Sequence, residues 1–141
     1  MKYKSTRGQV ADLGFSDALL MGLASDGGLL VPETIPDVSS ELEHWRDLNF
    51  VELAQELIPK FIDDIDSQTL RGLIAESYAS FSHADVVALQ DLDGISVLEL
   101  FHGPTLAFKD IAMQLIGQMF NKILRKKNLR ATVVAATSGD T

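Results

Sequence analysis

One ten-residue segment constrains this chain more than any other, because a strand-like run, a tight turn and the start of a helix meet in it. The segment has the sequence FHGPTLAFKD at residues 101–110, and the apolar run ISVLELF at 95–101 leads into it. A strand that passes through a Gly-Pro turn into an amphipathic helix begins a β-α-β unit. The sequence therefore predicts an α/β fold in which Lys109 stands at the start of a long helix.

The positive charge of a lysine at this position has to be compensated, because a helix N-terminus carries partial positive charge that disfavours an ammonium group. Solvent, a bound phosphate or conversion of the amine into an imine would each provide this compensation, and the imine is how lysine acts as a covalent handle. Leu106 and Phe108 are apolar neighbours that would favour the neutral amine. The local pattern alone also fits a solvated surface lysine, so both interpretations stay open.

The first 85 residues predict a small cap of helices and short extended pieces. Apolar residues at helical spacing, preceded by capping residues, define the helices, and Gly and Pro mark the turns. The expected elements are a helix at 17–24 capped by Ser16, a turn at 26–28, a strand at 29–31, a loop at 33–47, a helix at 50–58 capped by Asn49, and a helix capped by Ser67.

The character of the chain changes from Val86 onward, where short apolar runs replace the helical stripes. The runs at 86–90 and 95–101 predict a β-hairpin with Gly94 at its turn. A helix follows from about 109 to 127, and Asn128 ends it. The run ATVVAA at 131–136 predicts a buried strand parallel to 95–101.

These elements predict a chain of two parts, a region of helices and short extended pieces at 1–85 and a second part at 86–141. The β-α-β order of the second part is that expected at the start of an α/β sheet. A doubly wound sheet needs more strands than the chain holds, so we expect the chain to stop inside a functional loop.

Small residues follow the expected strand at 131–136. Backbone N–H groups at a strand-to-helix turn form a nest for anions, and the dipole of a following helix strengthens it. A carboxylate and a phosphate fit such a nest equally well, whereas a P-loop is excluded because no Gly-Lys-Ser/Thr follows. The candidate anion ligands are Thr137, Ser138, Gly139, Asp140 and Thr141.

A second candidate anion site lies near the N-terminus, where Arg7 follows the hydroxyl residues Ser5 and Thr6. A guanidinium group binds phosphate or carboxylate in a bidentate manner, and hydroxyl groups add donors. A flexible charged terminus is the alternative interpretation of the same residues.

Composition and spacing exclude several other classes of function. The formal net charge of −8 opposes nucleic-acid binding, which depends on neutralising phosphates. No apolar run reaches the roughly 18 residues of a membrane span, the N-terminus has no signal-peptide pattern, and the absence of cysteine excludes disulfides. His44, His83 and His102 are too far apart for a local metal motif. We expect a cytosolic protein without a metal.

Four segments occur in the order found at the front of threonine synthases, and the chain resembles this family of pyridoxal-phosphate enzymes along its whole length. The segments are YKSTRG at 3–8, DGGLLVPE at 26–33, LELFHGPTLAFKD at 98–110 and ATSGDT at 136–141. The resemblance implies the fold type II architecture of that superfamily. In this architecture, residues 1–85 would be the N-terminal region, and residues 86–141 would begin the catalytic domain with its three-layer α/β/α sheet. The resemblance also implies that Lys109 forms the Schiff base with pyridoxal phosphate, beside Phe108, and that residues 137–141 receive the substrate's α-carboxylate.

The resemblance further implies a lyase that converts O-phospho-L-homoserine and water into L-threonine and phosphate. Lys109 would then also act as a general base at the substrate carbons, and Ser5, Thr6 and Arg7 are the candidates for binding the substrate phosphate. The family's later glycine-rich loop for the cofactor phosphate is absent from this chain, so we expect the chain alone to be inactive.

Two alternatives remain at this stage. One is another pyridoxal-phosphate enzyme of β/γ-elimination or replacement, such as a threonine dehydratase-like protein. Asp140 argues against it within the resemblance, because many relatives that act on serine- or cysteine-type substrates carry Asn there. The other is a non-catalytic binding module that keeps the start of the fold without the chemistry.

Overall fold

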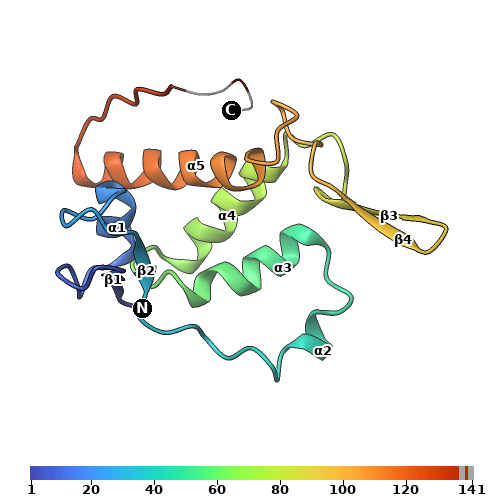
Figure 1. Cartoon of the computed structure of the whole chain (residues 1–141), viewed down its shortest axis with the longest axis horizontal. Coiled ribbons are helices and arrows are strands. Elements are labelled where there is room, and N and C mark those ends of the chain that lie inside the picture. Colours follow the sequence, from blue (N-terminus) through green and yellow to red (C-terminus); the bar gives the residue numbers. More distant parts are fainter. Residues whose placement is uncertain (137–138, 140–141) are drawn as a thin grey trace. The chain divides into compact units, whose positions relative to one another are not determined.

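Turns and capping residues divide this chain into five α-helices, a short 3₁₀ helix and two antiparallel strand pairs within the described residues, 1–136 and 139. A computed structural model gives their arrangement within each part of the chain (Figure 1). The chain forms two compact units, one of residues 1–48 and 52–71, the other of residues 49–51 and the chain from 72 onward.

In the first unit, β1 (Tyr3–Ser5) pairs antiparallel with β2 (Leu30–Pro32), with Tyr3 opposite Pro32 and Ser5 opposite Leu30. The predicted turn at 26–28 is confirmed: Gly27 has a φ of 77°, which glycine adopts without strain, and its N–H donates to the carbonyl of Ala24. The turn brings β2 back beside β1.

Helix α1 (Phe15–Met21) begins earlier than expected, and the prediction that Ser16 caps it is wrong. Gly14 is the N-cap residue, and the backbone N–H of Ser16 donates to Asp64 Oδ2 over 2.8 Å. A carboxylate from 48 residues further along the chain thus satisfies an N–H that the helix itself leaves unpaired.

The segment predicted as a loop at 33–47 contains one short helix, α2 (Leu42–Trp45). The backbone N–H of Trp45 donates to the Glu41 carbonyl, and the Trp45 side chain is only 7% exposed. Burial of a large aromatic ring stabilises this turn, which the weak local periodicity did not indicate.

The two predicted helices that follow are confirmed as α3 (Phe50–Leu57), which continues into the 3₁₀ helix η1 (Ile58–Lys60), and α4 (Ser67–Tyr78). The predicted cap of α4 is off by one residue. Asp66 Oδ1 accepts the backbone N–H of Thr69 over 2.9 Å, so Asp66 and not Ser67 supplies the capping oxygen.

In the second unit, the predicted hairpin is confirmed as β3 (Ala88–Leu92) and β4 (Ile95–Glu99), paired antiparallel with Leu92 opposite Ile95. Asp93 and Gly94 form its turn with φ angles of 42° and 89°. Positive φ at both central residues matches the right-handed twist of paired strands, which makes this sequence a strong hairpin signal.

Helix α5 (Asp110–Lys127) is the predicted long helix, and Asn128 ends it in the left-handed conformation, with φ 52° and ψ 41°. Leu115, Met119 and Ile123 are its buried apolar residues, at a spacing of four that places them on one face of the helix. Within residues 1–136, no helix combines the length and the apolar character that crossing a bilayer requires.

The prediction of a buried strand at 131–136 is wrong for this structure. The segment has no strand partner among the described residues, and Val133 and Val134 are 80% and 91% exposed. A strand exists only where a neighbour accepts its hydrogen bonds, and both sheets in the described part of the chain are two-stranded and antiparallel. The described residues therefore form a mixed α/β structure without the expected parallel sheet.

Candidate functional site

The loop between β4 and α5 positions Lys109, and local hydrogen bonds close this loop tightly. The backbone N–H of Leu106 donates to the Gly103 carbonyl over 3.1 Å, and Leu106 adopts a φ of 62°. Lys109 is the N-cap residue of α5, and its carbonyl accepts the N–H of Met113 over 2.8 Å. The structure thus places Lys109 where the sequence predicted it, at the head of the long helix.

The side chain of Lys109 is half-buried, and its Nζ lies 5.4 Å from the centre of the Phe108 ring. Phe108 and Leu106 themselves are 58% and 71% exposed. The predicted apolar neighbours are therefore present, and they lie on the solvent-facing side of the loop.

Asp110, the first residue of α5, is the buried acidic group of this loop, with 3% of its surface exposed. Its Oδ2 accepts the backbone N–H of Thr105 over 2.8 Å and the Thr105 hydroxyl over 2.9 Å, and Gln114 Nε2 donates to Oδ1 over 3.3 Å. Burial raises the pKa of Asp110, but these hydrogen bonds outweigh it and hold the pKa below its usual range. The sequence alone assigned no role to Asp110.

Gly103 makes room for this carboxylate. A Cβ added at Gly103 would stand 2.4 Å from the Asp110 Cβ and 2.5 Å from its Oδ2, far inside van der Waals contact. The glycine of the FHGPT turn is therefore required for its lack of a side chain, and not for a positive φ.

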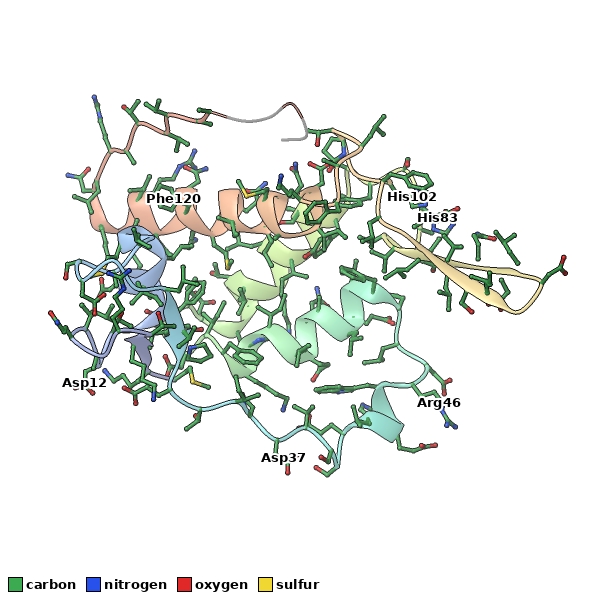
Figure 2. The ribbon with its side chains drawn as sticks, viewed as in Figure 1. Asp12, Asp37, Arg46, His83, His102 and Phe120 are labelled. Atoms are coloured by element: carbon green, nitrogen blue, oxygen red, sulfur yellow. The ribbon has the colours of Figure 1, made fainter. Side chains whose placement is uncertain are left out.

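His102 anchors the loop at its other end. Its Nε2 lies 2.8 Å from Glu99 Oε2, and its carbonyl accepts both the backbone N–H and the hydroxyl of Ser82. Figure 2 shows His102 next to His83 where the hairpin joins the rest of its unit, with ring centres 4.9 Å apart. These contacts support a structural role for His102.

The N-terminal candidates Ser5, Thr6 and Arg7 lie in the other compact unit, against the turn at 26–28. Ser5 is 3% exposed, and its hydroxyl donates to Asp26 Oδ1 over 2.7 Å. The same oxygen accepts the backbone N–H of Gly28 over 2.9 Å. The hydrogen bond from Ser5, followed by that from Gly28, lowers the pKa of Asp26. Two of the motifs noted in the sequence therefore form one hydrogen-bonded cluster.

Thr6 and Arg7 face outward from this cluster. The Thr6 hydroxyl accepts the backbone N–H of Leu29 over 3.0 Å, and Arg7 Nη1 donates to the Asp26 carbonyl over 3.0 Å. Both residues are exposed. A guanidinium group has five N–H donors, so Arg7 keeps donors for an anion beyond this contact.

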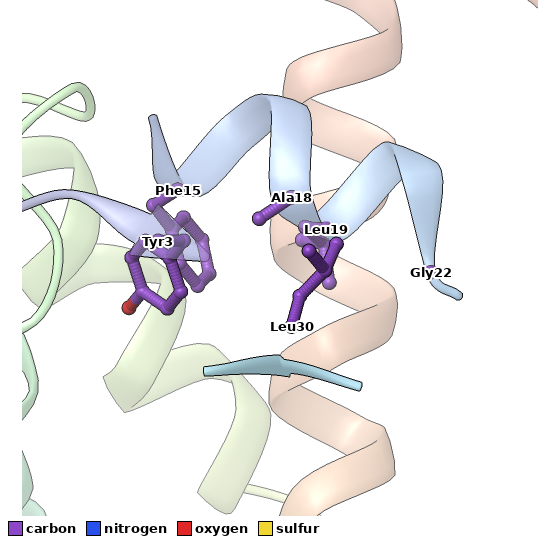
Figure 3. A pocket seen from close by; sticks show the side chains of 6 residues that line it. All are labelled: Tyr3, Phe15, Ala18, Leu19, Gly22 and Leu30. Carbon is purple, nitrogen blue, oxygen red and sulfur yellow. The ribbon is translucent and has the colours of Figure 1, made fainter. Parts of the chain in front are cut away.

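An apolar pocket of about 210 Å³ lies in the same unit between α1 and β2 (Figure 3). The one polar side chain that lines it belongs to Tyr3, whose hydroxyl donates to the Phe61 carbonyl over 2.9 Å. With that hydroxyl already engaged, the pocket offers packing surface and no group for catalysis. Its lining residues are Tyr3, Phe15, Ala18, Leu19, Gly22 and Leu30.

The candidate anion loop lies largely outside the described residues, which include Gly139 but not Thr137, Ser138, Asp140 or Thr141. Gly139 has a φ of 107°, a conformation that residues with a side chain rarely adopt. Among the described residues, no group of three or more His, Asp or Glu side chains is arranged to hold a metal ion.

Comparison with known proteins links this geometry to one family. A family model described as "Threonine synthase N terminus" matches residues 2–78, more than half of the chain. The threonine synthase of Pseudomonas aeruginosa is 46% identical over 144 residues, covering 100% of this chain and 31% of the relative. The threonine synthase of Schizosaccharomyces pombe is 43% identical, and the match covers 100% of this chain and 30% of the relative. The chain therefore spans about 30% of the length of these relatives.

Solved structures agree with the sequence relatives. The crystal structure of PLP-bound threonine synthase from Brucella melitensis superposes with a TM-score of 0.87 at 43% identity, covering 91% of this chain and 28% of that one. The crystal structure of threonine synthase from yeast superposes with a TM-score of 0.83 at 38% identity, and the match covers 90% of this chain and 27% of the yeast chain.

Proposed function

The chain belongs to the threonine synthase family, and we propose that it forms the N-terminal part of an enzyme that makes L-threonine and phosphate from O-phospho-L-homoserine and water. The observation that carries the proposal is the placement of Lys109 at the head of α5, half-buried beside Phe108. The chain spans about 30% of its relatives, so the activity is proposed for the complete protein.

The residues around Lys109 fit a pyridoxal phosphate tethered to its Nζ. The exposed ring of Phe108 and the exposed side chain of Leu106 offer apolar surface beside that nitrogen. The Asp110 carboxylate in the same loop is buried and accepts hydrogen bonds from Thr105 and Gln114, which stabilise its charge locally. When bound, the cofactor would supply an electron sink for a carbanion on the carbon attached to its imine nitrogen.

Lys109 would have two roles in this proposal. Its Nζ would hold the cofactor covalently, and, with the substrate bound, the same nitrogen would act as a general base at the substrate carbons. The net reaction would release phosphate from the γ-carbon and add water at the β-carbon.

The substrate's two anionic groups need separate donors. We propose that Thr137, Ser138, Gly139, Asp140 and Thr141 receive the α-carboxylate, mainly through backbone N–H groups. For the phosphate we propose Ser5, Thr6 and Arg7. Arg7 would contribute its exposed guanidinium group, and Ser5 would hold the turn at Asp26 that supports it.

The same proposal assigns the domains. Residues 1–85 would form the family's N-terminal region, and residues 86–141 would begin the cofactor-binding domain with its three-layer α/β/α sheet. In that setting the exposed run at 131–136 would find the parallel neighbour that the described residues do not supply.

A chimera tests the function directly. Residues 1–141 would replace the aligned 31% of the Pseudomonas aeruginosa threonine synthase, so that the remainder of a known enzyme completes the protein. The chimera should form threonine from O-phosphohomoserine, whereas the 141-residue chain alone should not. Borohydride reduction followed by peptide mapping should place the cofactor on Lys109.

Two controls make the result specific. Lys109→Ala should abolish the labelling and threonine formation, and Lys122→Ala, an exposed lysine of the same helix, should change neither. Labelling at another lysine would contradict the assignment of Lys109. A folded chimera that eliminates from threonine or serine but not from O-phosphohomoserine would favour the threonine dehydratase-like alternative.

A further inference from the structure

The β4–α5 loop contains a buried carboxylate that the proposed chemistry does not use. Asp110 follows Lys109 directly in the sequence and is 3% exposed. Burying an aspartate is unfavourable unless hydrogen bonds replace its hydration, and here donors that include the Thr105 peptide, the Thr105 hydroxyl and the Gln114 amide do so. A group that needs this much compensation is expected to have a specific role.

The hydrogen bonds of Asp110 join the two segments on either side of Lys109. Oδ2 binds both donors of Thr105, which precedes Lys109 in the loop, and Oδ1 binds Gln114, one turn into α5. The carbonyl of Lys109 is held as well, by the N–H groups of Ala112 and Met113. The backbone of Lys109 is thus fixed between loop and helix.

Because Gly103 and Asp110 are in close contact, the position of the Asp110 side chain leaves no room for added atoms between them. The space for even one methyl group is missing between Gly103 and Asp110, because an added Cβ would stand 2.4 Å from the Asp110 Cβ. The loop also contains Leu106 in the left-handed conformation, with a φ of 62°, which is unfavourable for a residue that has a side chain. The contacts of Asp110 offset such strain by closing the loop.

We propose that Asp110 is a positioning residue for Lys109: its carboxylate joins Thr105 to the first turns of α5 and so directs the lysine side chain toward the cofactor. This inference rests on the proposed function of Lys109 and adds a residue to it. Lysine has a long flexible side chain, so its reactive nitrogen is placed only if its backbone is placed. Displacement of a reacting group by about 1 Å costs up to roughly 100-fold in rate.

A purely electrostatic role at the helix N-terminus is the competing explanation, and the two differ in what they require. An electrostatic role requires a negative charge and no particular geometry. Positioning requires a short side chain that accepts two hydrogen bonds from Thr105. In Asp110→Asn, Oδ1 still accepts both Thr105 donors, and the Gln114 amide turns to accept from Nδ2. Asp110→Glu keeps the charge, but its extra methylene has no room beside Gly103.

The experiment uses the chimera described above and follows condensation of the Lys109 amine with the cofactor aldehyde, which releases one water. The absorbance change gives the rate, and circular dichroism gives the folded fraction. We expect Asp110→Ala and Asp110→Glu to slow the reaction roughly tenfold or more. Asp110→Asn should stay within about threefold of the parent. Asp91→Ala, which removes a carboxylate that accepts the Ser96 hydroxyl over 2.6 Å in the exposed hairpin, should leave the rate unchanged.

A second readout needs no cofactor. Amide hydrogen exchange in the peptide at 103–113 should accelerate in Asp110→Ala and Asp110→Glu, and not in Asp110→Asn or Asp91→Ala. If Asp110→Ala fails to fold, Thr105→Val, which removes one of the two Thr105 donors, should give an intermediate loss of rate.

The outcomes separate the two proposals. A folded Asp110→Ala protein with the parent's rate overturns the positioning role, and so does an Asp110→Glu protein that reacts faster than Asp110→Asn. Failure of the parent chimera to carry the cofactor on Lys109 would instead refute the proposed function.

Discussion

Replacing Tyr78 with Phe tests how the end of α4 supports the start of α5. The Tyr78 side chain is 6% exposed, and its hydroxyl donates to the Ile111 carbonyl over 3.1 Å, two residues beyond Lys109. Its ring packs edge-on against Phe50, with centres 4.9 Å apart, and against Phe81, at 5.6 Å. Phe keeps the ring packing, so the variant isolates the hydroxyl.

The expected loss of stability at pH 8 is about 1 kcal/mol, the usual net value of one intramolecular hydrogen bond. The difference should shrink at alkaline pH, because burial raises the pKa of Tyr78 above the ordinary value of a tyrosine. The unfolded chain releases the tyrosine proton first as the pH rises. The stability from Tyr78 is therefore present in full below pH about 10 and falls as the pH rises through the folded-state pKa.

The size of this alkaline effect follows from linkage. At pH 11 an unfolded tyrosine with a pKa of about 10 is mostly ionised, and if the folded one stays protonated the loss reaches about 1.4 kcal/mol. Partial solvent screening reduces the expected value to about 1 kcal/mol. Because Phe has no proton to release, the free energies of unfolding of parent and variant should converge near pH 11.

Urea denaturation followed by circular dichroism at pH 8 and pH 11 measures both differences. The chain has two tyrosines, so Tyr3→Phe leaves Tyr78 as the single one for a titration of tyrosinate absorbance. Tyr3 needs this separation because burial, Asp64 and Asp63 raise its pKa as well. The reasoning is refuted if Tyr78 titrates with an ordinary pKa near 10 while the protein is folded, or if the gap between parent and Tyr78→Phe is the same at both pH values.

Two glycine substitutions should act in opposite directions in the same denaturation assay at neutral pH. Gly28→Ala should destabilise the chain by about 2 kcal/mol, because the new Cβ would lie 2.1 Å from Ser5 Oγ; an unchanged midpoint would mean that the packing at Ser5 is loose. Gly117→Ala should stabilise it by about 0.5–1 kcal/mol, because this exposed helical position of α5 has open space for the methyl group and alanine favours the helix; a loss of stability would show a hidden contact there.

Much of the local structure follows from the sequence by itself. The turn at Asp93 and Gly94, the stop of α5 at Asn128 and the start of α5 after Lys109 were all predicted and are confirmed. Each depends on backbone sterics and hydrogen bonds within a few residues, which residue type determines directly. For the same reason the placement of Lys109 at a strand–turn–helix junction was predictable.

The partners of polar groups were not predictable in this way. Asp64 caps α1 from 48 residues away, and Ser5 binds Asp26 across 21 residues. The carboxylate of Asp110 turns inward to Thr105, although a first-turn aspartate is normally a surface charge. Periodicity describes which face of an element is apolar, and it carries no information on which distant group supplies a hydrogen bond.

The run at 131–136 shows most clearly the difference between what the local sequence determines and what distant contacts decide. Its composition predicted a buried strand, yet Val133 and Val134 are exposed, because a strand is completed by hydrogen bonds to a neighbouring chain segment and none is present among the described residues. The sequence by itself determined where helices, turns and the hairpin form and where the reactive lysine stands. The tertiary structure alone decided which carboxylates are buried and whether a strand-forming run becomes a strand, since both depend on groups brought together only by folding.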